Sequence, residues 1–268
     1  MTVRTARLSA ALLFAAPLAA APLHAQGVEY ATGTTKYRIS TNAKGSQTSP
    51  GGNADFQLGV QEQITVNVMK HAKDTVMATM TLDSIAFQSA GPAPDVSKVT
   101  GAHFVTLMSP TGKFYSSKAP DGIDPALGQI TDGIGRFLPA FRGNVANGVT
   151  WMDTTTGKVS VQGMDMDRTS VSNYKVNGDT TISGEKAFRV QRITTSKAAG
   201  SGSMQGTPMT METSGTGTGA FFITPKGVFL GSTSTDDVNT KITVLAQNAQ
   251  NVEISVKQNV QTKVEAIK

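Results

Sequence analysis

Cysteine is absent from this chain of 268 residues. Its absence excludes a disulfide framework, a thiol nucleophile and the cysteine that carries the lipid of a bacterial lipoprotein. Aromatic residues make up only 6% of the chain and form no girdle at the ends of the predicted strands, which argues against a transmembrane barrel. Charged residues make up 16%, and Lys and Arg form no run, so we expect no nucleic-acid partner.

Histidine is scarce as well, which leaves little from which a catalytic site could be built. Apart from the N-terminal leader described below, the chain has His71 in a predicted turn and His103 before a predicted strand. No Gly-x-Ser-x-Gly motif is present to supply a nucleophilic serine. We therefore expect no catalytic residues, no cofactor and no metal, and an enzyme is the least favoured class of function.

Two short motifs have a chemical interpretation and a simpler one. Asp165 and Asp167 could ligate Ca²⁺ or Mg²⁺, but they lack EF-hand spacing and are better explained as part of a solvated turn. The alternating glycines of Gly215–Gly219 resemble a phosphate-binding loop. They precede a predicted strand rather than a helix, so the helix N-terminus that would hold a phosphate is missing.

The N-terminus has the pattern of a secretory signal peptide. Arg4 and Arg7 give a basic start, and Ala10–Ala21 is an apolar run too short to span a membrane as a stable helix. Leu23–Ala25 then supplies a small residue before a predicted cleavage at Gln26. A single N-terminal transmembrane anchor is the alternative.

We therefore divide the chain into a signal peptide, residues 1–25, and one domain, residues 26–268. The second part carries 22 basic and 19 acidic side chains, a net charge of about +3. Its length is enough for one sizeable core, and no linker divides it. We expect a mature protein that is periplasmic or secreted and is not an integral membrane protein.

A long β-strand is the clearest structural signal in this domain. Within Phe56–Val68, apolar residues occupy even positions and polar residues fall between them, the period of two of a strand with one buried face. A strand of this length would span roughly 40 Å, so it must twist and curl within a large antiparallel sheet. The apolar positions are Phe56, Leu58, Val60, Ile64, Val66 and Val68.

The next strand contains a change of phase. Its apolar residues are even from Val76 to Leu82 and odd from Ile85 onward, which predicts a β-bulge at Asp83 or Ser84. The pairing we expect sets Val68 opposite Val76. Near the C-terminus, we expect a second long hairpin with Val238 opposite Val260.

Over residues 124–138 the apolar residues recur at steps of three and four instead of two, which predicts the main helix. Asp124 followed by Pro125 is a good helix start, and Pro139 ends the run. Several glycines weaken the helix, so it should depend on docking against the sheet. Its apolar stripe is Leu127, Ile130, Ile134, Phe137 and Leu138. Further strands follow, and the Gly, Ser and Thr of Ala198–Gly219 predict a flexible loop.

Methionines form two clusters with two interpretations. Their thioether sulfurs could bind Cu(I) in an exported protein. Alternatively, they are adaptable lining of a core or apolar pocket, which we favour because no His or Cys helper is close in sequence. The clusters are Met164 with Met166, and Met204 with Met209 and Met211.

Polar residues interrupt the apolar faces of the two longest strands. Glu62 shares a face with Ile64, and Gln258 and Thr262 share a face with Val260. Polar groups in a dry core are costly unless they form hydrogen bonds or reach water. They mark either a wet cavity or the places where the strands leave the core, and the sequence leaves both interpretations open.

The combination of an export signal, long curved strands and one helix ending at Leu138–Pro139 resembles a family of bacterial secreted proteins. That family is related in architecture to the lipoprotein-localisation carriers and the mycobacterial lipid-binding lipoproteins (LolA/LolB/LppX-like). The segments Gly148–Trp151, Ile182–Ala187 and Gly219–Gly227 contribute to the resemblance, which covers most of the domain. It implies a half-closed barrel with a helix across its mouth that shelters a lipid or acyl chain, and it supplies no catalytic residues.

We therefore predict an all-β fold, a strongly curved antiparallel sheet or half-open β-barrel with the helix packed on its concave side. The function we expect is an exported, non-catalytic protein that binds or carries an apolar, lipid-like ligand. The alternative is a structural or protein-interaction module of the bacterial envelope with a filled core. The expected cavity-lining residues are Glu62, Leu127, Ile130, Ile134, Phe137, Gln258 and Thr262.

Overall fold

The computed structural model describes residues 27–89, 95–123, 127–161, 164–204, 207–245 and 251–267. The predicted signal peptide, residues 1–25, lies outside this part of the chain.

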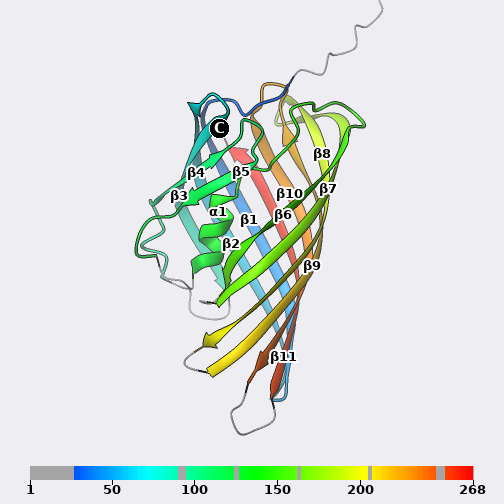
Figure 1. Ribbon diagram of the computed structural model, residues 1–268. Helices are drawn as coiled ribbons and strands as arrows, with labels where there is room; N and C mark the ends of the chain where they lie inside the picture. The colour runs from blue at the N-terminus through cyan, green and yellow to red at the C-terminus, as the bar shows by residue number, and fades with distance from the viewer. Residues whose placement is uncertain are drawn as a thin grey trace, which may run out of the picture.

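The described chain forms one antiparallel sheet of eleven strands with one short helix (Figure 1), which confirms the all-β fold class. The strand order is β5-β4-β3-β2-β1-β11-β10-β9-β8-β7-β6, so β5 and β6 are edges and the sheet does not close. The strands are β1 (Gly33–Ser49), β2 (Gly52–Ala72), β3 (Thr75–Ser89), β4 (His103–Met108), β5 (Phe114–Lys118), β6 (Thr150–Val161), β7 (Met164–Ile182), β8 (Glu185–Met204), β9 (Thr207–Ile223), β10 (Phe229–Val244) and β11 (Val252–Ile267).

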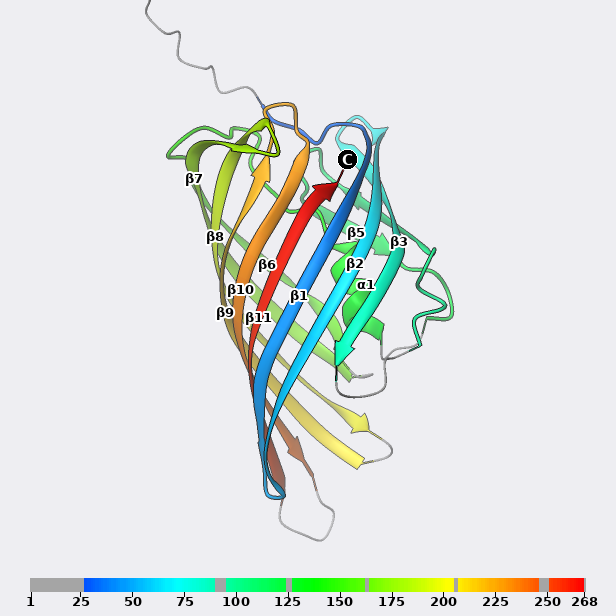
Figure 2. The ribbon, with the colours of Figure 1, turned by 180° about the vertical axis from the view of Figure 1, so that it is seen from behind.

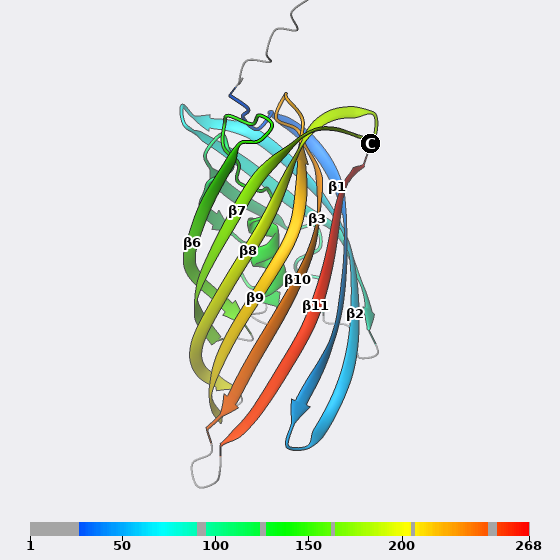
Figure 3. The same cartoon turned by 90° about the vertical axis from the view of Figure 1, so that its right-hand side faces the viewer.

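The sheet curls strongly along its length (Figures 2 and 3). Glycines on its inner face accommodate this curvature. A Cβ at Gly45 in β1 would collide with the backbone oxygen of Lys257, and one at Gly219 in β9 would collide with that of Thr233. A glycine at such a bend lets neighbouring backbones approach, which a larger residue would prevent.

The bulge in β3 lies where the change of phase predicts it. The partner of Gln63 is Ser84 and the partner of Ile64 is Leu82, which leaves Asp83 as the extra residue. The expected register is wrong by two residues, because Val68 pairs with Ala78. A shift of two keeps every side chain on its face, so the apolar pattern cannot detect it. The same holds for the last hairpin, where Val238 pairs with Gln258 rather than Val260.

The helix α1 spans Gly128–Gly135 and lies on the concave side of the sheet, against β4 and β6 (Figure 1). It is shorter than the range 124–138 predicted from the sequence, of which residues 124–126 lie outside the described chain. Thr106 of β4 fixes its C-terminal end, because its hydroxyl donates a hydrogen bond of 2.8 Å to the carbonyl oxygen of Gly135. In the described ranges, no helix has the length and apolar character needed to cross a membrane.

The prediction of a flexible loop over Ala198–Gly219 is wrong, because β8 and β9 extend through most of this segment. The loop was predicted because the segment is rich in Gly and Ser. Its threonines are β-branched and suit a strand, and its glycines lie where the inner face bends. Composition alone does not distinguish a curved, polar strand from a flexible loop.

The dry core occupies the end of the concave face at which the chain enters the sheet. It joins residues of the first strands to residues of β7–β11, including Tyr37, Ile64, Val190 and Phe229. An N-terminal segment closes this end: the Val28 amide donates to the Gly143 carbonyl at 2.6 Å, and the Tyr30 hydroxyl donates to the Pro139 carbonyl at 2.7 Å. The Tyr30 amide also donates to the Pro110 carbonyl at 2.7 Å and the Ala31 amide to the Gly227 carbonyl at 3.1 Å, so the segment is bonded to three connecting loops.

Candidate functional site on the concave face

The strand registers divide the concave face of β6–β10 into three bands. The dry core ends at Trp151, whose ring stacks on that of Tyr174. The next rows carry Ser, Thr, Gly and Arg side chains, with Arg192 facing Tyr174 and Arg168 facing Ala198. Beyond them lies a second, separate apolar cluster built from methionines. The concave face is therefore apolar at both ends and polar between them.

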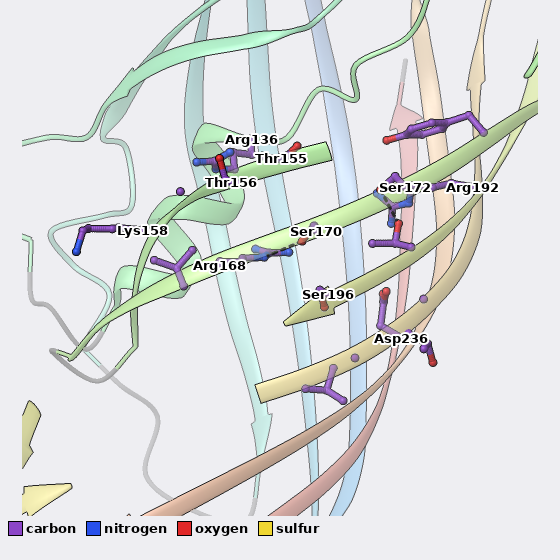
Figure 4. Close-up of a pocket in the computed structure, with 18 residues that line it drawn as sticks. Arg136, Thr155, Thr156, Lys158, Arg168, Ser170, Ser172, Arg192, Ser196 and Asp236 are labelled. Atoms are coloured by element: carbon purple, nitrogen blue, oxygen red, sulfur yellow. Dashed lines mark hydrogen bonds between the residues drawn. The ribbon is translucent and has the colours of Figure 1, made fainter. Parts of the chain in front are cut away.

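The polar band contains a cavity of about 230 Å³ (Figure 4), which we call the polar cavity. It lies over β6–β10, and Arg136, just after α1, borders it on the helix side. Alternate residues of β9, Gly215 and Gly217, line it and contribute no side chain to fill it. The glycines that resemble a phosphate loop in the sequence therefore lie in a strand and leave open space on its inner face.

Basic side chains outnumber acidic ones around the polar cavity. Of the described residues that line it, Arg136, Lys158, Arg168 and Arg192 are basic and Asp236 is acidic. Arg136 is compensated, because its Nε lies 3.1 Å from the carboxylate of Asp132. Lys158 is exposed and lies 3.6 Å from Asp167.

The two remaining arginines have no such compensation. Among the residues that the structure describes, neither Arg168 nor Arg192 forms an ion pair with a carboxylate. Arg168 Nε donates a hydrogen bond of 3.2 Å to the Ser170 hydroxyl, so its side chain runs along β7 into the cavity. The local balance is an excess of positive charge in a concave site.

Hydroxyl groups form the rest of the polar lining. The hydroxyls of Ser172 and Thr194 lie 2.8 Å apart on adjacent strands, and Ser234 donates to the Asp236 carboxylate at 3.0 Å. Burial raises the pKa of the Tyr174 hydroxyl at the core end of the cavity. The cavity thus offers guanidinium and hydroxyl donors, which suit a ligand rich in acceptor oxygens.

Four of the five methionines of the two sequence clusters meet at the far end of the cavity, and the side chain of Met204 lies outside the described part of the structure. Met166 of β7 faces Gly200 of β8, which faces Met211 of β9, and a parallel row joins Met164 and Met209 across Gly202. A Cβ at Gly200 would lie 2.9 Å from the Met166 Cγ, so the glycines make room for the thioether side chains. We call Met164, Met166, Met209 and Met211 the methionine cluster; each is at most 6% exposed.

The residues predicted from the sequence to line a cavity do not lie around the polar cavity, and those of the helix region pack into the dry core. Leu127 and Ile134 are each 4% exposed, and Ile130 and Phe137 pack against the same core. The ring of Phe137 contacts those of Tyr37 and Phe229 at centroid distances of 5.0 and 5.7 Å. The helix therefore fills the upper part of the concave face.

The three polar residues of the long strands lie on the concave face beyond β10. Glu62 is partly buried between Ile39 and Ile85, and burial raises the pKa of its carboxyl. The Thr262 hydroxyl lies 3.4 Å from that of Thr41. Gln258 borders a shallow depression at the far end of β1 and β11. None of the seven expected residues lines the polar cavity.

Sequence reasoning missed Arg168, Arg192 and the serines around them. A signal was available in β7, where Met164, Met166, Arg168, Ser170, Ser172 and Tyr174 occupy alternate positions and therefore share one face of the strand. A strand that is apolar, then polar, then apolar on one face is the pattern of a face that crosses a wet cavity. It was obscured because Asp165 and Asp167 were interpreted as part of a solvated turn, which divides this strand.

The sequence matches no family model and no curated protein. Solved structures that match this chain include OccK2 (OpdF) of Pseudomonas aeruginosa, at 6% identity and a TM-score of 0.25 over 88% of this chain and 98% of that chain. A domain of Vibrio parahaemolyticus named for outer membrane lipoprotein sorting matches at 10% identity and a TM-score of 0.19, over 87% of this chain and 84% of that one.

A DUF1329 family protein of Desulfovibrio piger matches at 7% identity and a TM-score of 0.20, over 87% of this chain and 86% of that one. Similarity at such TM-scores carries no functional argument, and function must be derived from the residues of this chain.

Proposed function

We propose that this is an exported binding or carrier protein for a lipid-like ligand, which it holds on the concave face of the open sheet. One observation supports this most directly: side chains do not fill the concave face between α1 and the methionine cluster. Below α1 it contains a cavity of about 230 Å³, and Val159 of β6 both lines this cavity and packs against the methionine cluster. Polar and apolar surfaces therefore adjoin within one open groove.

The size of the cavity bears on how a ligand would lie. Pockets for small molecules usually enclose about 300–1,000 Å³. The polar cavity is smaller than that, so it would hold one part of a ligand, while the remainder lies along the groove. Methionine side chains are flexible and polarisable, and they can repack around a chain of variable length. The proposal assigns the protein no catalytic step.

A specific observation favours the alternative, a structural module of the envelope. The apolar stripe of α1 is packed into the core with Tyr37 and Phe229, so the helix is not free to act as a gate over an open mouth. Under this alternative, the polar cavity is a hydrated gap between strands and binds nothing tightly.

The two functions are distinguished by native mass spectrometry of protein purified from an exporting host. A carrier retains endogenous lipid, detected as a discrete mass increment, and binds a fluorescent fatty acid in a saturable manner. Ser196→Trp fills the polar cavity, whereas Thr195→Trp adds the same ring on the opposite face of β8.

We expect the Ser196→Trp variant to lose both the increment and the fluorescent probe, and the Thr195→Trp variant to keep them. A wild-type protein that carries no increment and binds no probe would favour the structural module.

A further inference from the structure

The uncompensated arginines carry a more specific inference about the same site. Arg168 and Arg192 lie on adjacent strands and enter the polar cavity six residue pairs apart. At about 3.3 Å per residue, their Cα atoms are separated by roughly 20 Å along the strands. The Arg168 side chain extends toward Arg192, because its Nε donates to the Ser170 hydroxyl (Figure 4). The two guanidinium groups therefore approach the same stretch of the cavity from opposite ends.

Like charges in a concave site with partly apolar walls raise the local positive potential and attract anions. The Asp236 carboxylate lies in the row of Ser172, between the two arginines, but it accepts a hydrogen bond from Ser234 and forms no ion pair among the described residues. Guanidinium groups form paired, charge-assisted hydrogen bonds with phosphate and carboxylate oxygens. The hydroxyls of Ser170 and Ser172 add donors that can rotate to suit such a ligand.

The position of Arg168 connects this charge to the apolar end of the groove. Arg168 follows Met166 by two residues, so both side chains lie on the concave face of β7. Met166 is 1% exposed within the methionine cluster. Val159 and Ala198 are partly exposed and pack against this buried cluster, so they give the cavity an apolar edge beside Arg168, which pairs with Ala198.

We infer that the ligand is an anionic amphiphile, whose acidic headgroup, a phosphate or a carboxylate, is held between Arg168 and Arg192 while its hydrocarbon tail lies along Val159 and Ala198, which cover the methionine cluster. This inference rests on the proposed function and specifies the ligand class of that site. It distinguishes the site from one for neutral lipid, which would gain nothing from two unpaired arginines, and from one for a free anion, which would gain nothing from the apolar edge.

Probes that share one hydrocarbon chain test the headgroup. Dodecyl phosphate, dodecyl maltoside and inorganic phosphate are each titrated into the mature protein below micelle-forming concentrations, and binding is measured by calorimetry. We expect dodecyl phosphate to bind at least about tenfold more tightly than either of the others, since a hydrogen bond to a charged group contributes about 1.5–3 kcal/mol.

Double substitutions test whether Arg168 and Arg192 cause the preference for dodecyl phosphate. Arg168→Gln with Arg192→Gln should remove the preference for dodecyl phosphate and leave the affinity for dodecyl maltoside unchanged. Arg38→Gln with Arg189→Gln removes the same charge from exposed positions outside the cavity and should behave as the wild type does. Thermal unfolding of each variant verifies that it is folded.

Three results would overturn the inference. Equal binding of dodecyl phosphate and dodecyl maltoside shows a site indifferent to charge, which leaves the proposed function standing. Binding of inorganic phosphate as tight as that of dodecyl phosphate shows a site for a free anion. Failure of both dodecyl probes to bind removes the proposed function together with the inference.

Discussion

Trp151 of β6 stacks on Tyr174 of β7, with ring centroids 4.8 Å apart and an interplanar angle of 11°. Trp151 is 9% exposed and belongs to the dry core, whereas Tyr174 lines the polar cavity. The stacked pair is therefore the boundary between the filled and the open parts of the concave face. Trp151 is also the single tryptophan of the chain, so its fluorescence reports on this boundary alone.

Tyr174→Leu should open this boundary. Loss of the stacked pair removes about 0.5–1.5 kcal/mol in addition to the buried area of the ring. We expect a lower free energy of unfolding in urea and a red-shifted emission of Trp151, as water reaches its indole ring. Tyr115→Leu, at a half-exposed position on edge strand β5, is the control and should leave the emission unchanged. An unshifted spectrum in Tyr174→Leu would show that other side chains keep Trp151 dry.

Gly200→Val should disturb the methionine cluster. A Cβ at this position would lie 2.9 Å from the Met166 Cγ and would collide with the backbone oxygen of Asp165. Overpacking of this kind costs about 1–3 kcal/mol, measurable by urea denaturation. Ala199→Val adds two carbons to the neighbouring, exposed position on the other face of β8 and should change stability by less than about 0.5 kcal/mol. Equal losses in the two variants would mean that the glycine is needed for the strand and not for the methionines.

Glu62 should make stability depend on pH. Burial raises the pKa of its carboxyl in the folded state above the ordinary value of 4.5, so the folded state binds a proton that the unfolded state has released. Stability therefore decreases as pH rises from about 4.5 through the raised pKa. Glu62→Gln should increase the free energy of unfolding at pH 7, and the gain should vanish on acidification below pH 4.5.

Glu185→Gln, at the exposed first residue of β8, is the control for this titration and should change stability little at any pH. A gain from Glu62→Gln that persists at low pH would be due to packing and not to the charge.

The sequence predicted those features of the fold that depend on alternation along one strand. The long faces of β2 and β11, the bulge at Asp83 and the docked helix all follow from which residues are apolar. Registers were wrong by two because a shift of two, such as Val68 onto Ala78 rather than Val76, preserves every face. The length of the turn decides between such registers, and no pattern of apolar residues specifies it.

The candidate site was less predictable because it is assembled across strands. Arg168 and Arg192 are 24 positions apart in the chain, and Met166 and Met211 are further apart, so their proximity depends on the registers of two hairpins, β7–β8 and β8–β9. Glycines that suggested a loop instead line the cavity floor in β9. The composition of a segment does not show where a glycine will leave open space on the inner face of a curved sheet.

The position of a bound ligand on the concave face can be measured through the methionine methyl groups. The mature protein is labelled with ¹³C at the methionine methyls, and NMR spectra are recorded while dodecyl phosphate is added. We expect saturable shifts of the Met166 and Met211 signals, which lie beside the polar cavity, and no shift of the exposed Met69 and Met152. Assignment uses single Met→Leu variants. Shifts confined to Met69 or Met152, or no saturable shift in the methionine cluster, would contradict binding on the concave face.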